Sequence, residues 1–212
     1  MKLVDNLEEQ AVLEDLIESA KPPRPQGPEF ARLHYLLATP FRYPPLRHGS
    51  RFGTAIVRGI WYGSRSPHTV MAEVAHYRFL FLDGSAADLR QLVTEHSLFH
   101  VPLATEKGID LTTLPFSEYE ARFKSKTDYR STQALGQAMR EAGVEAFLFR
   151  SARDPEGGSN VGVFSPRAFA RKTPLPSTPQ TWRCLANDHE VVFSRINSMS
   201  AQSMAFGREV SA

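Results

Sequence analysis

The sequence contains a single cysteine, and this scarcity excludes an internal disulfide framework. Because Cys184 has no partner within the chain, packing and hydrogen bonds must hold the fold, and a reducing compartment is expected. The first twenty residues are rich in acidic side chains and have no apolar core of the signal-peptide type. We therefore expect a cytoplasmic protein.

Long hydrophobic runs and an excess of charge are also missing. No stretch reaches the roughly 18 uncharged apolar residues that span a bilayer, so a membrane location is not expected. The net charge is only +2, from 25 basic and 23 acidic residues, which leaves no electrostatic footprint for direct nucleic-acid binding. With 42% hydrophobic and 23% charged residues over 212 positions, the chain suits one folded domain.

Common signatures of catalytic and cofactor sites are absent as well. The sequence has no G-x-G-x-x-G loop, Walker loop, H-E-x-x-H helix or paired cysteines. Its seven histidines are scattered, with His96 and His100 the closest pair, so no metal site is predicted. Ser151 lies outside a G-x-S-x-G elbow, which argues against an acyl-transfer nucleophile.

Hydrophobic spacing predicts an N-terminal helix over residues 4–20, which the prolines of residues 21–25 end. We expect residues 1–30 to form this helix and a proline-rich linker, and residues 31–212 to form the main domain. The helix could pack on that domain or dock a partner, and the sequence leaves both possibilities open.

Helices and strands interleave without a regular period in the main domain. Further helices are predicted over 67–80, over 86–95, and from the capping residue Asp128 to Gly143. Strands, one of which could be two short ones, are predicted over 54–62, 97–104, 144–150, 161–164 and 190–196. This alternation favours an α+β fold over a doubly wound parallel sheet.

The helix predicted over 67–80 carries a carboxylate on its apolar side. Glu73 lies on the same side as an apolar stripe at helical spacing, formed by Val70, Val74, Tyr77 and Phe81. Because burying an unpaired carboxylate is costly, Glu73 should be in an ion pair, at the stripe edge with its head in water, or in a cleft.

Three other side chains are candidates for a binding or catalytic site. Arg51 lies in a glycine-flanked turn, where it could grip phosphate oxygens or be an ordinary surface arginine. Tyr62 ends a predicted strand and could stack on a flat heterocycle or complete the core. Ser151 follows another predicted strand, and its hydroxyl could serve a site or satisfy local backbone groups.

These four positions lie in sequence pieces that resemble the RES family, whose members are toxins with an ADP-ribosyltransferase-like fold. The pieces are GSRFG with Arg51, GIWYGS with Tyr62, SPHTVMAEVAHYR with Glu73 and FLFRSAR with Ser151, and the likeness extends over roughly 35–171. Eleven residues separate Arg51 from Tyr62, and eleven separate Tyr62 from Glu73. The resemblance implies a mixed sheet core with surrounding helices.

The resemblance also implies an activity, the cleavage of the nicotinamide–ribose bond of NAD with water or phosphate as acceptor. Glu73 would stabilise the oxocarbenium-like state or activate the acceptor. Arg51 would hold the pyrophosphate or an adjoining ribose edge, and Tyr62 would stack on nicotinamide. Ser151 would bind the ribose or position Glu73. NAD would be the substrate, and no metal is implied.

Two other functions stay open at this point. The chain could transfer ADP-ribose from NAD to a protein, or it could be a catalytically silent module that binds NAD or docks a protein. The family implies a cognate antitoxin, an Xre-like DNA-binding protein, as the partner in a toxin–antitoxin system. It also suggests a homodimer, although no interface signature is visible.

Overall fold

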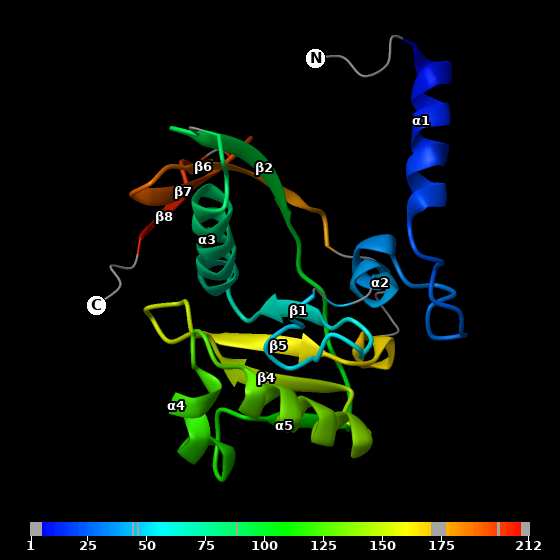
Figure 1. Cartoon of the computed structure of the whole chain (residues 1–212), viewed down its shortest axis with the longest axis vertical. Coiled ribbons are helices and arrows are strands. Elements are labelled where there is room, and N and C mark those ends of the chain that lie inside the picture. The colour runs from blue at the N-terminus through cyan, green and yellow to red at the C-terminus, as the bar shows by residue number, and fades with distance from the viewer. Residues whose placement is uncertain are drawn as a thin grey trace.

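The computed structural model describes residues 6–43, 45, 47–87, 89–170, 177–198 and 200–208. Its strands form two four-stranded sheets, which we name the site sheet, in the order β1-β5-β4-β3, and the antiparallel sheet, in the order β2-β6-β7-β8. Within the site sheet only β3 and β4 run parallel. The long helix α3 connects the two sheets (Figure 1). This arrangement confirms the predicted α+β class and mixed sheet.

In chain order, the helices and the strands of the site sheet are α1 (Leu7–Ala20), α2 (Tyr35–Arg42), β1 (Trp61–Ser64), α3 (Pro67–Asp83), β3 (Gly108–Asp110), η1 (Phe116–Tyr119), α4 (Glu120–Phe123), α5 (Arg130–Glu141), β4 (Ala146–Arg150), β5 (Ser159–Val163) and η2 (Pro166–Ala168). The antiparallel sheet consists of β2 (Leu92–Leu98), β6 (Gln180–Ala186), β7 (Glu190–Arg195) and β8 (Ser203–Gly207).

Helix α3 begins where its sequence supplies a cap. The Ser66 hydroxyl accepts a hydrogen bond from the Thr69 backbone N–H at 3.1 Å, and Pro67 occupies the first turn. Both features suit a helix start. The helix ends at Gly84, whose N–H bonds to the Leu80 carbonyl. The predicted helix over 67–80 is therefore confirmed, with almost one more turn.

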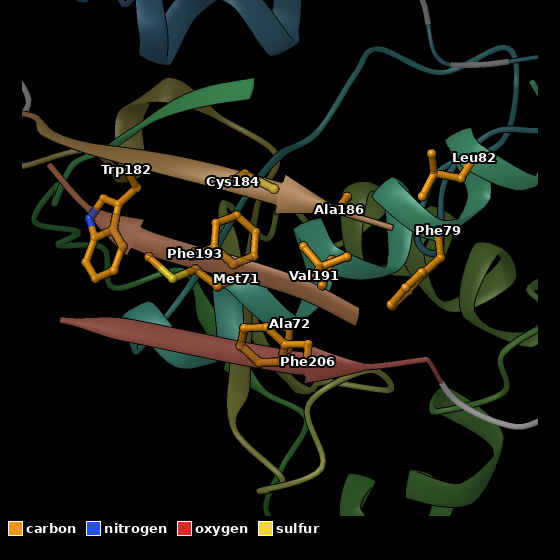
Figure 2. Close-up of a cluster of buried hydrophobic side chains, with 11 residues drawn as sticks. Met71, Ala72, Phe79, Leu82, Trp182, Cys184, Ala186, Val191, Phe193 and Phe206 are labelled. Carbon is orange, nitrogen blue, oxygen red and sulfur yellow. The ribbon is translucent and has the colours of Figure 1, made fainter. Parts of the chain in front are cut away.

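The predicted apolar stripe of α3 is wrong in its exposed half. Tyr77 is 61% and Phe81 52% exposed, while Val70 and Val74 only border the core. The buried residues of the helix that pack on the antiparallel sheet are Met71, Ala72, Ala75, Phe79 and Leu82. Figure 2 shows labelled members of this cluster facing Trp182, Cys184, Ala186, Val191, Phe193 and Phe206. Apolar residues occur nearly all round α3, so spacing alone allows two stripes, and contact with the sheet selects one.

The predicted helix over 86–95 is wrong as well, since residues 92–95 belong to β2 and the described residues of 86–91 are not helical. Ser85 caps only a turn, in which its hydroxyl accepts from the Ala87 N–H at 3.2 Å. Burial alternates along β2 with a period of two, which is the pattern of a half-buried strand. The strand predicted over 97–104 correspondingly ends early, at Leu98.

The strand predicted over 54–62 forms only at its end, in β1, because 54–60 is irregular and Ile56 is 94% exposed. The structure confirms the predicted helix before Gly143 as α5, but Asp128 is not its cap: the capping position is Tyr129, and Asp128 accepts from the Arg130 N–H one residue further on. The last three predicted strands are confirmed as β4, β5 and β7. Three strands escape the sequence prediction: β3, β6 and β8.

The two faces of the site sheet bury separate clusters. Phe147 and Phe149 pack with Phe52 and with Met139 of α5, and we call this side the α5 face. Other residues of β4 and β5 pack with α2 on the opposite side, in the cluster that contains Leu37, Phe41, Ala146 and Val163. Gly136 lets α5 approach closely, because a Cβ there would overlap the Phe52 carbonyl. The Arg51–Phe52 turn is thereby pressed against the sheet.

Helix α1 stands away from both sheets (Figure 1) and has no buried residue. Glu18 connects it to α2 through Arg42 at 2.8 Å and also pairs with Lys21 and Arg24. Hydrogen bonds from Lys21, Arg42 and Arg24 lower the pKa of Glu18 to about 2. Residues 4 and 5 of the predicted helix lie outside the described residues. The division into 1–30 and 31–212 stays a prediction.

No helix of the described chain combines the length and the apolar character that crossing a membrane requires.

Candidate functional site

Glu73 lies in the second turn of α3 and contacts Ser151, which follows β4 of the site sheet. Its Oε1 accepts two hydrogen bonds of 2.6 Å, one from the Ser151 hydroxyl and one from the Asn160 side-chain amide. Both donors are uncharged, and among the described residues no ion pair includes Glu73. Of the three arrangements that the sequence allows, the ion pair is therefore not observed.

Ser151 is fully buried at the end of β4. Its hydroxyl accepts from the N–H groups of Arg153 at 3.1 Å and Asp154 at 2.9 Å, and it donates to Glu73. A hydroxyl offers one donor and two acceptor positions, and all three are used here. Both proposed roles of Ser151 thus coexist, because it caps the local backbone and also contacts Glu73.

Asn160 is a site residue that sequence reasoning missed. It is 5% exposed and lies directly opposite Ser64 in the pairing of β1 with β5. Its Oδ1 accepts from the Ser64 hydroxyl at 2.6 Å while its Nδ2 donates to Glu73. Only strand register brings these residues together, although Ser64 already stands in the GIWYGS piece.

Tyr62 lies on the same face of β1 as Ser64, since the two are separated by one residue. Its hydroxyl is hydrogen-bonded with Ser50 at 3.0 Å and accepts from the Phe52 N–H at 3.4 Å, and the ring packs edge-on against Phe149. The residue is 37% exposed. Burial raises the pKa of Tyr62 to about 12, against the lowering effect of the Ser50 hydrogen bond. Part of the ring thus completes the core, and part faces outward.

Arg51 is held in place by the chain that follows α4. Its Nη1 donates to the carbonyls of Phe123 and Ser125, each at 2.7 Å, and its guanidinium lies 4.7 Å from the centre of the Tyr129 ring. Hydrogen bonds and a cation–π contact together fix the orientation of the group. Arg51 is therefore more constrained than an ordinary surface arginine.

Two further tyrosines surround these residues. Tyr77 follows Glu73 by one helical turn. Burial raises the pKa of Tyr77, the charges of Tyr129 and Glu73 add to the effect, and those of Arg51 and Arg153 oppose it. Contacts also connect the surroundings of Glu73 with those of Arg51. Arg153 donates from its N–H to the Ser151 hydroxyl and from Nη2 to the Lys126 carbonyl, beside the Ser125 carbonyl that Arg51 binds. Glu73 and Arg51 therefore share one neighbourhood. Its aromatic border includes Tyr77, Tyr129 and Tyr62.

A cavity among the described residues lies beside the site sheet. It has a volume of about 700 Å³ and is bordered by Trp61, Leu148 and Val161 of the site sheet together with Leu98 and Val101. Of the four predicted site residues only Tyr62 borders it. Arg51, Glu73 and Ser151 do not border this cavity, whereas Tyr62 and Ser64 of β1 do.

One group of metal-ligand side chains occurs among the described residues. Ligand-type atoms of His68, Asp154 and Glu156 lie within 4.8 Å of one another. The two ring nitrogens of His68 face different carboxylates, with Nδ1 3.2 Å from Asp154 and Nε2 3.5 Å from Glu156. These three side chains bring the start of α3 close to the loop that Ser151 begins.

The family model of the RES domain matches residues 24–185 of the 212-residue chain. No curated protein matches the sequence. RES domains are associated with NAD-related enzymatic activity. The match spans more than half of the chain and includes Arg51, Tyr62, Glu73 and Ser151. The resemblance seen in the sequence is thereby confirmed, and the chain belongs to the RES domain family.

Proposed function

We propose that this RES domain degrades NAD by cleaving its nicotinamide–ribose bond, with water or phosphate as acceptor. The observation that carries the proposal is the set of contacts that Glu73 makes. Its Oε1 accepts hydrogen bonds from the side chains of Ser151 and Asn160. Neither donor carries a positive charge, so a Glu73 carboxylate would face an oxocarbenium-like state without a cation already paired to it.

In the proposed reaction, the bond between the anomeric carbon of the ribose and the nicotinamide nitrogen breaks. Nicotinamide leaves with the bonding electron pair, which cancels the positive charge of its ring. Water then attacks the anomeric carbon and releases a proton, which yields ADP-ribose, or phosphate attacks and yields the corresponding sugar phosphate. Glu73 would lie beside the anomeric carbon and stabilise its charge before the acceptor arrives.

The other residues receive roles that fit their contacts. Tyr62 would stack the outward part of its ring on nicotinamide. Arg51 already uses Nη1 for two loop carbonyls, so its other N–H groups would face the pyrophosphate or a ribose edge. Ser151 has no hydrogen-bonding position left for the ribose, and we assign it to positioning Glu73.

A second function, transfer of ADP-ribose to a protein, is favoured by the openness of the surface near Glu73. Tyr77, Leu80 and Phe81 of α3 are each at least half exposed. An exposed apolar strip beside a catalytic carboxylate could seat a protein that supplies the acceptor side chain. Such an enzyme and the NAD-degrading enzyme share the first step and differ only in the acceptor. A cognate DNA-binding antitoxin is the partner that we propose from the family.

The deciding experiment is incubation of the full chain with NAD, with and without inorganic phosphate, followed by mass spectrometry of the products. NAD degradation predicts free nicotinamide with ADP-ribose or its phosphate. Glu73→Gln, which is nearly isosteric, should slow the reaction to a small residual rate. Label that moves from adenylate-labelled NAD onto a protein would favour the second function. NAD binding without turnover by the folded chain would reject both in favour of a silent module.

A test in cells addresses toxicity separately. Expression of the chain alone in bacteria should deplete NAD and stop growth, whereas expression of Glu73→Gln at the same level should do neither. Normal NAD levels at high expression of the folded protein would contradict a toxin function.

A further inference from the structure

Asn160 shares one oxygen of Glu73 with Ser151, although it lies outside the sequence pieces that pointed to the site. The distance from Nδ2 to Oε1 is 2.6 Å, as short as the bond from Ser151. Asn160 is 5% exposed and belongs to the central strand β5 rather than to a loop. Strand pairing holds the backbone of Asn160 on both sides. The amide is therefore a rigidly placed donor.

The orientation of the Asn160 amide follows from its two neighbours. On one side the Ser64 hydroxyl lies 2.6 Å from Oδ1, and on the other side stands the Glu73 carboxylate. A reversed amide would place its oxygen against a carboxylate oxygen, which is repulsive, so the amide nitrogen must face Glu73. The hydroxyl of Ser64 then completes the arrangement by donating to Oδ1.

We infer that Asn160 is a positioning residue for Glu73, oriented in turn by Ser64. This inference rests on the proposed function, because Glu73 must act on NAD for its placement to matter. Asn160 and Ser151 bind Glu73 Oε1 from two elements, β5 and the end of β4. Hydrogen bonds from two directions therefore fix the carboxylate. Its other oxygen, Oε2, keeps a constant orientation as a result. An amide donor achieves this without cancelling the negative charge.

The decisive test compares Asn160→Asp in two backgrounds. The variant keeps the acceptor for Ser64 but turns an oxygen toward Glu73, so kcat for NAD cleavage should fall about 10- to 100-fold with KM changed less than about threefold. In the Glu73→Gln background the same change should alter the residual rate less than about twofold, because the residue it acts through is gone. An equal loss in both backgrounds would overturn the inference.

Two companion variants separate positioning from folding. Asn187→Asp makes the same chemical change in the turn between β6 and β7, where Oδ1 only accepts from the N–H groups of His189 and Glu190, and kcat should not change. Ser64→Ala removes only the group that orients Asn160, so a decrease of about threefold in kcat is expected, again only when Glu73 is present. If Asn160→Asp does not fold, a Ser64→Ala variant with unchanged kcat would overturn the inference.

Failure of the proposed function can be told apart from failure of this inference. A wild-type chain that consumes no NAD with water, phosphate or protein acceptors rejects the function. The placement of Glu73 then remains measurable in crystals of Asn160→Ala. The inference predicts that the Glu73 carboxylate leaves its wild-type position or occupies several positions, and an unchanged carboxylate would overturn it.

Discussion

Arg51, which we propose as an NAD-binding residue, also has contacts that support the fold. Its Nη1 bonds to the carbonyls of Phe123 and Ser125, so its removal leaves two acceptors without this donor. Arg51→Ala should raise KM for NAD about tenfold or more and change kcat less, because it removes binding rather than chemistry. It should also lower the midpoint of thermal unfolding by a few degrees, as lost hydrogen bonds of about 1 kcal/mol each do.

Steady-state kinetics and calorimetry measure these two effects. Arg183→Ala is the matched control, because Arg183 is exposed on β6 of the antiparallel sheet, and neither quantity should change. An unaltered KM for Arg51→Ala would remove Arg51 from the binding of NAD.

Tyr62 makes a prediction about alkaline pH. Burial raises its pKa from the usual 10 to about 12, so between these values the folded chain keeps a proton that the unfolded chain has lost. The contribution of Tyr62 to stability is complete below pH 10 and is lost as the pH rises to 12. Stability should therefore fall less steeply over this range in Tyr62→Phe than in wild type. Urea unfolding at several pH values tests this, and parallel curves would contradict it.

The candidate site could be predicted from the sequence where it depends on local patterns and family pieces. Glu73 and Ser151 are within hydrogen-bond distance, as the positioning role of Ser151 requires. Asn160 could not be predicted, because its place beside Glu73 depends on which residue of β1 it pairs with. Strand register is a long-range property, and neither composition nor helical spacing encodes it.

Among the elements, α3 carries the sharpest test of packing. Phe79 is 8% exposed against the antiparallel sheet, whereas Phe81 on the same helix is 52% exposed. Phe79→Ala should lower the free energy of unfolding by about 3 to 5 kcal/mol, as removal of a buried ring does. Phe81→Ala should change it by less than about 0.5 kcal/mol. Chemical denaturation measures both changes. Equal losses of stability in Phe79→Ala and Phe81→Ala would contradict this packing and support the stripe that the spacing predicts.

Strands were harder to predict than helices, and the reasons differ from strand to strand. In β2 the alternation of burial is present, but a capping serine and leucines before it suit a helix equally. In β6 the buried residues Trp182, Cys184 and Ala186 also alternate, yet polar neighbours dilute the signal. The edge strand β8 buries only Phe206, so its existence depends on pairing with β7 rather than on its own pattern.

At the scale of the whole molecule, α1 is an attachment rather than a part of the core. It buries no residue, and Glu18, near its end, makes the ion pairs to Lys21, Arg24 and Arg42. Removal of residues 1–17, which leaves these pairs intact, should shift the midpoint of thermal unfolding by less than about 2 °C. A larger loss, seen by calorimetry, would mean that α1 packs on the body of the protein in solution.

The two sheets meet mainly through α3, and the proposed chemistry sits where that helix touches the site sheet. The apolar face of α3 binds the antiparallel sheet, while Glu73 bonds to the ends of β4 and β5. Because one helix carries both sets of contacts, we expect that loosening the apolar cluster would also displace Glu73 relative to its donors.

Cys184 is fully buried in the cluster between α3 and the antiparallel sheet. Its chemical reactivity can therefore report how often this cluster opens. Burial raises the pKa of its thiol, so little reactive thiolate forms, and reagents must wait for the antiparallel sheet to open. Alkylation should be at least about a thousandfold slower in native buffer than in urea, as the stability of a folded domain implies. Its rate, followed by mass spectrometry, would time the opening of this half of the molecule. A cysteine introduced elsewhere on the surface could meanwhile be labelled selectively with a fluorophore.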